Sequence, residues 1–411
     1  MPQNLIMAET YFRQAARQGY TPAMLNLAQM YSLGQGTAQS DSEAALWYRA
    51  AAEAGDAEAQ FTMGALYARG DGVAKRLVDA ARWFEKAATQ GHAAAQFNIA
   101  VFYRDGTGVE RDPGRALEWF GRAAEQGMAV AQTSLGKLHL SGEGVQRDYD
   151  TAAMWLRRAA EAGDGDAETT LGILHLHGHG VDRDLAAAEQ LFRQAAERGY
   201  APAHFQLGHF YSEDRGEGAN PVEAARCYRA AAEAGHLPSQ LILARNHLTG
   251  VWGPSDEAEA AAWFYRAAEA GHAGAQFQLA TMYCVAQGVP KDLGLAVAWF
   301  RRAAEQDERF AQYNLAVMLH KGDGVEADPE EALKWYRKAA EQGVPEAQIA
   351  LGDFYAAGRV VTIDHDEARR WFEKAASQGH EGAEPRLAAL ARLQEQRPAP
   401  AIQPPRAGTG S

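Results

Sequence analysis

Three histidines occupy alternate positions in the segment LGILHLHGHGVDRD, residues 171–184. Imidazole is the commonest side-chain ligand of metal ions near neutral pH, so His175, His177 and His179 raise the hypothesis of a metal site. On a helix, His175 and His177 point about 200° apart and cannot share one ion. His175 and His179 are better spaced, but a Gly-x-Gly loop ends the helix between them. We therefore expect no bound metal ion and no other cofactor.

A second candidate for chemistry is the segment SLGK, from Ser134 to Lys137. It has the Ser-x-x-Lys spacing of penicillin-recognising enzymes, in which the serine is the nucleophile. The partner motifs Ser-Asp-Asn and Lys-Thr-Gly are missing from the sequence. The Gly-x-Gly stretches follow predicted helices and lack the lysine of a phosphate-binding loop. We expect no catalytic residue, although hydrolysis or binding of a β-lactam at Ser134 and Lys137 stays as an alternative.

Composition excludes several function classes. The 411 residues carry a formal net charge of −13, which argues against a nucleic-acid-binding surface. No apolar run approaches the length of a membrane span, so we expect no membrane insertion. Two cysteines, Cys227 and Cys284, are too few for a disulfide framework. The first residues resemble no secretory signal, which favours the cytoplasm; the periplasm stays possible if an export signal precedes them.

The dominant feature is an internal repeat. The string Ala-Ala-x-x-Gly recurs at a constant step of 36 residues, with aspartate replacing glycine once. The turn residues are Gly19, Gly55, Gly91, Gly127, Gly163, Gly199, Gly235, Gly271, Asp307, Gly343 and Gly379. Positions below are counted forward from each turn residue. This regularity predicts one repeat array in place of two or three independent domains.

Each unit predicts two helices. Small or apolar residues at plus 4, 8, 9 and 12 form one helical face, with tyrosine frequent at plus 12. A Gly-x-Gly-Val loop follows, and an aspartate at plus 21 caps the second helix in several units. Alanine at plus 25, tryptophan at plus 28 and Ala-Ala at plus 32 and 33 form the face of that second helix. We expect an all-α chain of 22 helices without a sheet. Loops that depart from the pattern, such as AAGRVVTID at 356–364, keep the unit length.

These columns resemble the Sel-1-like repeat, a relative of the tetratricopeptide repeat. The segment AQFTMGALYARGDGVAKRLVDAARWFEKAATQG, residues 59–91, carries nearly the whole pattern. The resemblance implies a right-handed superhelical solenoid of helix-turn-helix repeats that serves as a non-enzymatic scaffold or adaptor, for example in bacterial signalling. One cysteine-rich branch of the family is described as acting on β-lactams, but it pairs cysteines within repeats. Here Cys227 and Cys284 lie far apart and in different columns.

The resemblance also divides the chain. Residues 1–19 correspond to an N-terminal half-repeat helix, 20–378 to ten repeats, and 379–396 to a C-terminal capping helix. Residues 397–411 are rich in proline and are expected to be disordered.

By similarity to tetratricopeptide arrays, the first helices should line a concave groove that binds a protein or peptide partner. The small polar column at plus 7 could pair with a partner's backbone, and the aromatic column at plus 6 could either contact a partner or pack between helices. A purely structural spacer without a partner is a further alternative, and we expect a monomer. The candidate groove residues are Asn26, Phe61, Thr62, Phe97, Asn98, Arg104, Thr170, Phe205, Gln206, Arg245, Phe277, Gln278, Tyr313 and Asn314.

Overall fold

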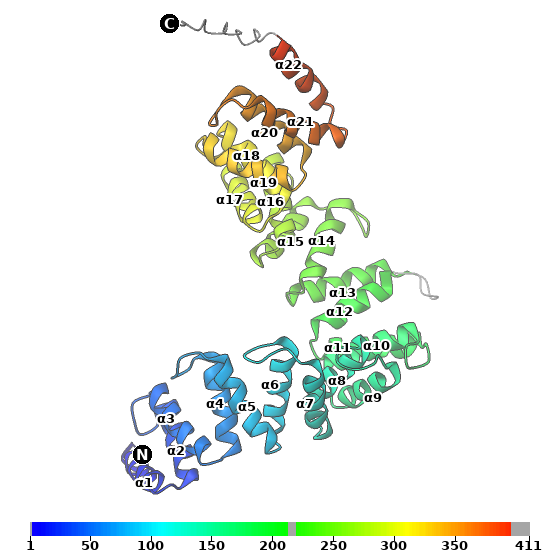
Figure 1. Cartoon of the computed structure of the whole chain (residues 1–411). Coiled ribbons are helices and arrows are strands. Elements are labelled where there is room, and N and C mark those ends of the chain that lie inside the picture. The colour runs from blue at the N-terminus through cyan, green and yellow to red at the C-terminus, as the bar shows by residue number, and fades with distance from the viewer. Residues whose placement is uncertain (1, 213–218, 396–411) are drawn as a thin grey trace, which may run out of the picture. The chain divides into compact units, whose positions relative to one another are not determined.

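A computed structural model describes residues 2–212 and 219–395, and side chains within 4–212 and 219–393. These ranges form 22 α-helices and no strand, as the repeat pattern predicts (Figure 1). The proline-rich segment expected to be disordered, 397–411, lies outside the described residues. The chain divides into two compact units, Met1–Phe210 and Tyr211–Ser411.

The first unit contains a lone second-type helix, five complete helix pairs and a final first-type helix. Its helices are α1 (Pro2–Arg17), α2 (Thr21–Leu33), α3 (Asp41–Glu53), α4 (Ala57–Arg69), α5 (Leu77–Thr89), α6 (Ala93–Asp105), α7 (Pro113–Glu125), α8 (Ala129–Ser141), α9 (Tyr149–Glu161), α10 (Gly165–His177), α11 (Leu185–Glu197) and α12 (Ala201–Ser212), which ends just past the boundary.

The second unit continues the same alternation and ends with a lone first-type helix. Its helices are α13 (Pro221–Glu233), α14 (Leu237–Thr249), α15 (Glu257–Glu269), α16 (Ala273–Val285), α17 (Leu293–Glu305), α18 (Arg309–Lys321), α19 (Pro329–Glu341), α20 (Pro345–Ala357), α21 (His365–Ser377) and α22 (Ala383–Glu395).

The second helices begin where the aspartate column predicts. Each of these aspartates accepts a hydrogen bond from the backbone amide three residues further on, at 2.9–3.0 Å. The carboxylate satisfies one of the amide groups that have no partner inside the helix. The caps predicted from sequence are confirmed for Asp112, Asp148, Asp184 and Asp292.

The second glycine of the Gly-x-Gly loop lies against the preceding second helix. Gly108 has a φ of 69°, and a Cβ atom there would stand 2.3 Å from the carbonyl oxygen of Leu77 at the start of α5. No side chain fits at that distance, so glycine is required for contact as well as for conformation. The loop thereby joins consecutive repeats.

The small residue at plus 9 receives an apolar side chain from the second helix of its own repeat. A Cβ atom on Gly64 would come within 2.5 Å of the Phe84 ring, and one on Gly352 within 2.4 Å of Phe372. Both rings are almost fully buried. The core of each unit thus lies between paired helices, surrounded by buried alanines.

The tryptophans of the plus 28 column differ in how deeply they are buried between helices. Trp119 is buried, whereas Trp83 is half-buried. In seven of the repeats a lysine or arginine three residues later lies over the indole ring at 3.9–4.8 Å, as Lys86 does over Trp83. This cation–π contact covers the part of the ring that the neighbouring helices leave open.

A buried glutamine at plus 5 links successive repeats and was not recognised from sequence. Gln96 Nε2 donates to the carbonyl oxygen of Ala88 at the end of α5, at 3.1 Å. Its Oε1 accepts from Gln126 at the end of α7, at 2.7 Å. We call this arrangement the glutamine link. The same pairing joins Gln90 to Gln60, Gln306 to Gln276, Gln342 to Gln312 and Gln378 to Gln348.

The glutamine link is incomplete where the later partner is alanine. Gln132 and Gln240 keep their bonds to a helix-end carbonyl, but their buried Oε1 atoms have no partner in the described structure. The residue 30 positions later is Ala162 for the first and Ala270 for the second. A buried acceptor without a partner lowers stability, so these are weaker joints.

Candidate partner-binding face

The plus 3, 6, 7, 10, 13 and 14 positions of the first helices form a surface that we call the first-helix face. Each unit carries its own part of this face. In the plus 7 column, Asn26 and Gln278 are exposed, and the others are half-buried. All fourteen candidate groove residues lie on first helices, and the half-buried members of the plus 7 column are Thr62, Asn98, Thr170, Gln206 and Asn314.

The asparagines of the plus 7 column bond within their own helix. Nδ2 of Asn98 donates to the carbonyl oxygen of Ala94 at 2.9 Å, and Asn26 and Asn314 make the same bond four residues back at 2.8 Å. An amide side chain has two donor protons and one acceptor oxygen. The oxygen and the second proton of each asparagine therefore remain for a partner.

The aromatic residues at plus 6 pack against the second helix of their own repeat. The ring centroid of Phe97 lies 5.5 Å from that of Phe120, and the ring of Phe61 lies 5.8 Å from Phe84. The two alternatives considered for this column are compatible, because each ring is only half-buried, although Phe61 also stacks on His92 at 4.7 Å. Equivalent contacts join Phe277 to Phe300 and Tyr313 to Tyr336, whereas Phe205 lies 4.9 Å from His209 on its own helix.

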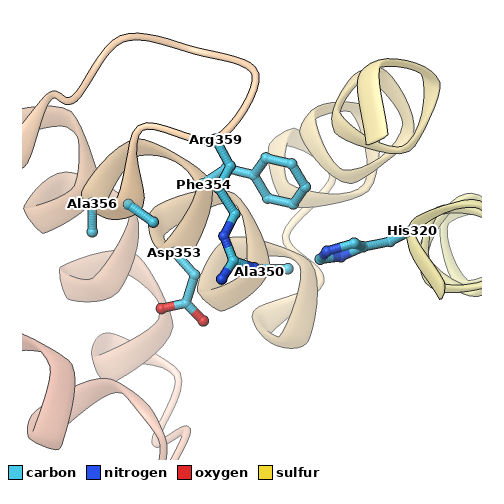
Figure 2. Close-up of a pocket in the computed structure, with 7 residues that line it drawn as sticks. His320, Ala350, Asp353, Phe354, Ala356 and Arg359 are labelled. Carbon is cyan, nitrogen blue, oxygen red and sulfur yellow. The ribbon is translucent and has the colours of Figure 1, made fainter. Parts of the chain in front are cut away.

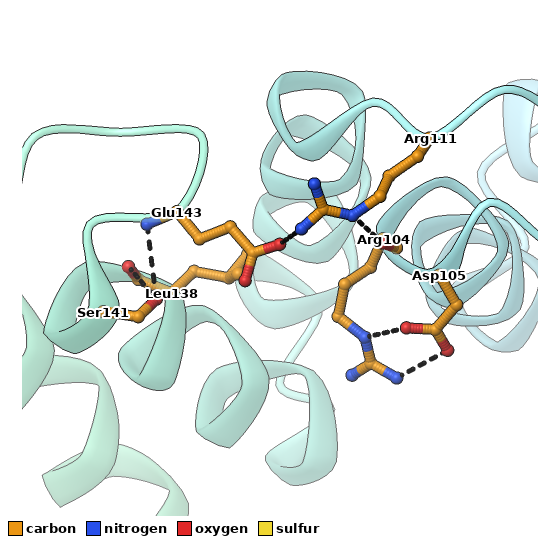
Figure 3. Close-up of polar contacts among 6 residues, drawn as sticks. All are labelled: Arg104, Asp105, Arg111, Leu138, Ser141 and Glu143. Atoms are coloured by element: carbon orange, nitrogen blue, oxygen red, sulfur yellow. Dashed lines mark hydrogen bonds and ion pairs between the residues drawn. The ribbon is translucent and has the colours of Figure 1, made fainter. Parts of the chain in front are cut away.

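Arg104 is engaged in a polar cluster at the end of α6. Its guanidinium makes two hydrogen bonds to Asp105, at 2.7 and 2.9 Å (Figure 3). Hydrogen bonding to Arg104 lowers the pKa of the Asp105 carboxyl. Arg111 donates to the backbone carbonyl of Arg104 and pairs with Glu143 of the next repeat. A partner carboxylate would have to displace Asp105, whereas Arg245 on α14 is exposed.

The first-helix face contains a hollow of about 470 Å³ on α20. Its wall consists of alanine side chains, the ring of Phe354, and three ionisable residues (Figure 2). We call it the α20 hollow, and its lining residues are His320, Ala350, Asp353, Phe354, Ala356, Ala357 and Arg359. The hollow was not predicted from the sequence, because it arises where α20 has alanines in place of the larger side chains of other repeats.

The three histidines of the opening segment have structural contacts. His175 Nδ1 lies 3.2 Å from the carbonyl oxygen of Asp182, and the ring of His179 stacks on Tyr149 at 4.9 Å. His177 stacks on His179 with ring centroids 5.7 Å apart. Among the described residues, no group of three or more His, Cys, Asp or Glu side chains is arranged to hold a metal ion.

Ser134 and Lys137 do not face each other as a nucleophile and its activating group would. The Ser134 hydroxyl donates to the carbonyl oxygen of Val130 in its own helix, at 2.8 Å. The Lys137 ammonium pairs with Asp166 of the next repeat. A serine nucleophile needs a nearby base that accepts its proton, and these contacts direct both groups elsewhere. None of the described helices has the length and apolar character needed to cross a membrane.

The 36-residue pairs match the Sel1 repeat. The matched segments are 1–20, 21–56, 57–92, 93–128, 129–164, 165–200, 201–236, 237–272, 273–308, 309–344 and 345–380. The chain belongs to the Sel1 repeat family. This confirms the resemblance inferred from the columns, with the N-terminal half-repeat counted as an eleventh segment.

Two solved structures of Sel1-type proteins are similar to the chain over most of its length. A protective antigen present in uropathogenic Escherichia coli strains, which displays an SLR fold, is 33% identical; the match covers 96% of this chain and 91% of that one, with a TM-score of 0.55. A Sel1 repeat protein from Oxalobacter formigenes is 31% identical, with coverage of 75% and 90% and a TM-score of 0.63. A search of curated proteins found no match.

Proposed function

We propose that this Sel1 repeat protein is a non-enzymatic scaffold that binds a protein or peptide partner on its first-helix face. The observation that carries the proposal is a recurring pair of neighbours, an aromatic ring at plus 6 beside a polar side chain at plus 7. These pairs are Phe61 with Thr62, Phe97 with Asn98, Phe205 with Gln206, Phe277 with Gln278, and Tyr313 with Asn314. Aromatic anchors contribute much of the binding free energy in protein interfaces.

The polar residue at plus 7 of each pair can form hydrogen bonds with the backbone of a bound peptide. An extended peptide presents backbone amide and carbonyl groups at regular intervals, and buried backbone groups must be paired. The free amide oxygen and proton of Asn98 and Asn314 can pair with them. Repeat arrays present such groups on extended surfaces, which suits a long, narrow partner. A role as a signalling adaptor, a cytoplasmic location and a monomeric state belong to this proposal, as does the absence of a nucleic-acid partner.

Photocrosslinking in the native host tests the face. A photoreactive amino acid at Asn98 should crosslink a discrete protein, whereas the same group at Arg82, an exposed residue of α5, should not. Once the partner is isolated, Asn98→Ala should weaken its binding by about 1–3 kcal/mol if the amide pairs with a buried backbone group. Crosslinks that arise from Arg82 and never from Asn98 would show that the second helices form the binding surface.

The enzymatic alternative is tested separately. We expect no hydrolysis of nitrocefin, because the Ser134 hydroxyl and the Lys137 ammonium are each engaged with other groups. Turnover that disappears in Ser134→Ala would contradict the non-enzymatic part of the proposal.

A further inference from the structure

The α20 hollow arises from two alanines on the first-helix face. At plus 7, α20 carries Ala350, whereas every other repeat has a larger residue there, such as Asn314 in the preceding one. At plus 14 it carries Ala357, where Lys321 stands in the preceding repeat. Because both side chains end at Cβ, two turns of α20 leave room beside the Phe354 ring. The part of the wall formed by Ala350, Ala357 and Phe354 is apolar.

The ionisable residues around the alanines leave one unpaired positive charge, that of Arg359. Both carboxylate oxygens of Asp353 accept hydrogen bonds from Arg386 of α22, at 2.7 and 2.9 Å, so Asp353 is neutralised. Arg359 is exposed; its backbone amide donates to the carbonyl oxygen of Phe354 at 3.3 Å, but its guanidinium has no hydrogen-bond or ion-pair partner among the described residues. The ring of His320, which comes from α18, packs on Phe354 at 5.1 Å and also lines the hollow (Figure 2). The α20 hollow therefore presents a free guanidinium and an imidazole to an entering group.

The loop that carries Arg359 differs from the other loops in its backbone. Val360 occupies the position of the second loop glycine and has a φ of 67°. This left-handed conformation is unfavourable for a β-branched residue. Gly324 in the preceding loop adopts a similar φ of 73° without that cost. Strained residues of this kind concentrate at ligand-binding sites.

We propose that the α20 hollow binds the C-terminal residue of a partner protein when that residue is aliphatic. Its alkyl side chain would lie between Ala350 and Ala357, and its α-carboxylate would pair with the Arg359 guanidinium while His320 donates a further hydrogen bond. Guanidinium and carboxylate match in planar, two-bond geometry. A chain terminus fits best because its side chain and carboxylate share one Cα atom, so one residue can reach both the alanines and Arg359. The proposal rests on the proposed function.

Ligand-observed NMR titration with capped dipeptides tests it. N-acetyl-Ala-Leu with a free carboxylate should bind at least tenfold more tightly than its C-terminal amide. N-acetyl-Leu-Glu-amide, whose only carboxylate is a side chain, should bind as weakly as that amide. If the amide matches the acid, the carboxylate is not recognised, and if the glutamate peptide matches it, the terminus is not the source. Either result overturns the proposal.

Variants of the full chain locate the site. Arg359→Gln should weaken binding of the acid by at least tenfold, and His320→Gln should weaken it less. Ala350→Leu should abolish binding by occupying the space of the ligand's alkyl side chain. Lys334→Gln, which removes an exposed charge on α19, is the matched control and should leave binding unchanged. Thermal melting of each variant verifies folding. Unchanged affinity in a folded Arg359→Gln variant would overturn the assignment.

The experiments distinguish failure of this proposal from failure of the proposed function. Crosslinks from Asn98 together with no dipeptide binding would overturn the α20 hollow and leave the first-helix face intact. Crosslinks confined to the second helices would overturn the proposed function, whatever the dipeptides do.

Discussion

At the scale of single residues, the glutamine link joins helices in consecutive repeats through one side chain. Gln96 is 4% exposed, and its amide group is satisfied on both sides, by Ala88 and by Gln126. In the low dielectric of a protein interior such bonds are strong, and a missing partner is costly. At Gln132 the buried Oε1 has no donor, so a substitution that supplies one should stabilise the protein.

We predict that Ala162→Gln stabilises the protein by about 0.5–1.5 kcal/mol, because the new amide can donate to the buried Oε1 of Gln132. Chemical denaturation measures the change. Ala54→Gln is the matched control, since it also ends a second helix but finds Met24 where a glutamine would be needed. Equal stabilisation by both substitutions would contradict the explanation.

The glutamine link also shows what the sequence conceals. Gln60, Gln96 and Gln132 recur at plus 5, so the signal was present. A glutamine at a helix start is ordinarily a surface residue, and its burial becomes evident only when its partner 30 residues later is known. The α20 hollow was concealed for a different reason, because alanines that create space look like alanines that fill it. The pairing of Arg104 with its neighbour Asp105 could have been foreseen from their adjacency.

At the scale of the elements, the sequence predicts almost everything. The turn glycine, the aspartate cap and the 3–4 spacing of apolar residues are local signals that act within a few residues, and they place all 22 described helices. The Gly-x-Gly loop is predicted as a helix terminator, but its contact with the preceding second helix is not. That contact brings together residues that are 31 positions apart, such as Leu77 and Gly108.

This contact distinguishes glycines that share a left-handed backbone conformation. Gly91 has a φ of 89° with no atom within 4 Å of a Cβ, whereas a Cβ on Gly108 would collide with Leu77. We predict that Gly91→Ala costs about 1–2 kcal/mol of stability from the backbone alone. Gly108→Ala should cost clearly more, roughly 3 kcal/mol or above, because a loop and a helix must separate. Thermal or urea denaturation compares the two, and similar losses would show that the loop contact is easily rearranged.

At the scale of the whole molecule, stability should be distributed between neighbouring repeats. Each repeat buries its core against adjacent ones, so a local defect weakens the joints beside it more than distant joints. Because each compact unit has its own set of packed helix pairs, we expect a defect in one unit to leave the stability of the other unchanged. The right-handed superhelical path and the monomeric state remain predictions at this scale.

Phe120→Ala tests how far a defect spreads. Phe120 is fully buried on α7, and its removal should cost about 3–5 kcal/mol locally. Hydrogen exchange monitored by mass spectrometry should show faster exchange in α6 through α9 and unchanged exchange in the second unit. Gln29→Ala, at an exposed position of α2, is the control. Uniformly faster exchange across the chain would indicate a single cooperative unit.

The placement of the glutamine link bears on how such a gene can change in length. Both glutamines of one link, Gln96 and Gln126, lie within the segment 93–128, and the carbonyl that the first one needs belongs to Ala88, whose counterpart in that segment is Ala124. A tandem duplication of the codons for 93–128 therefore regenerates both bonds of the glutamine link at the new junction. Deletion of the segment also preserves the bond, because Gln132 could then donate to the carbonyl oxygen of Ala88, which would stand where Ala124 had been. Recombination in whole repeats can thus lengthen or shorten the protein without any compensating mutation at this joint.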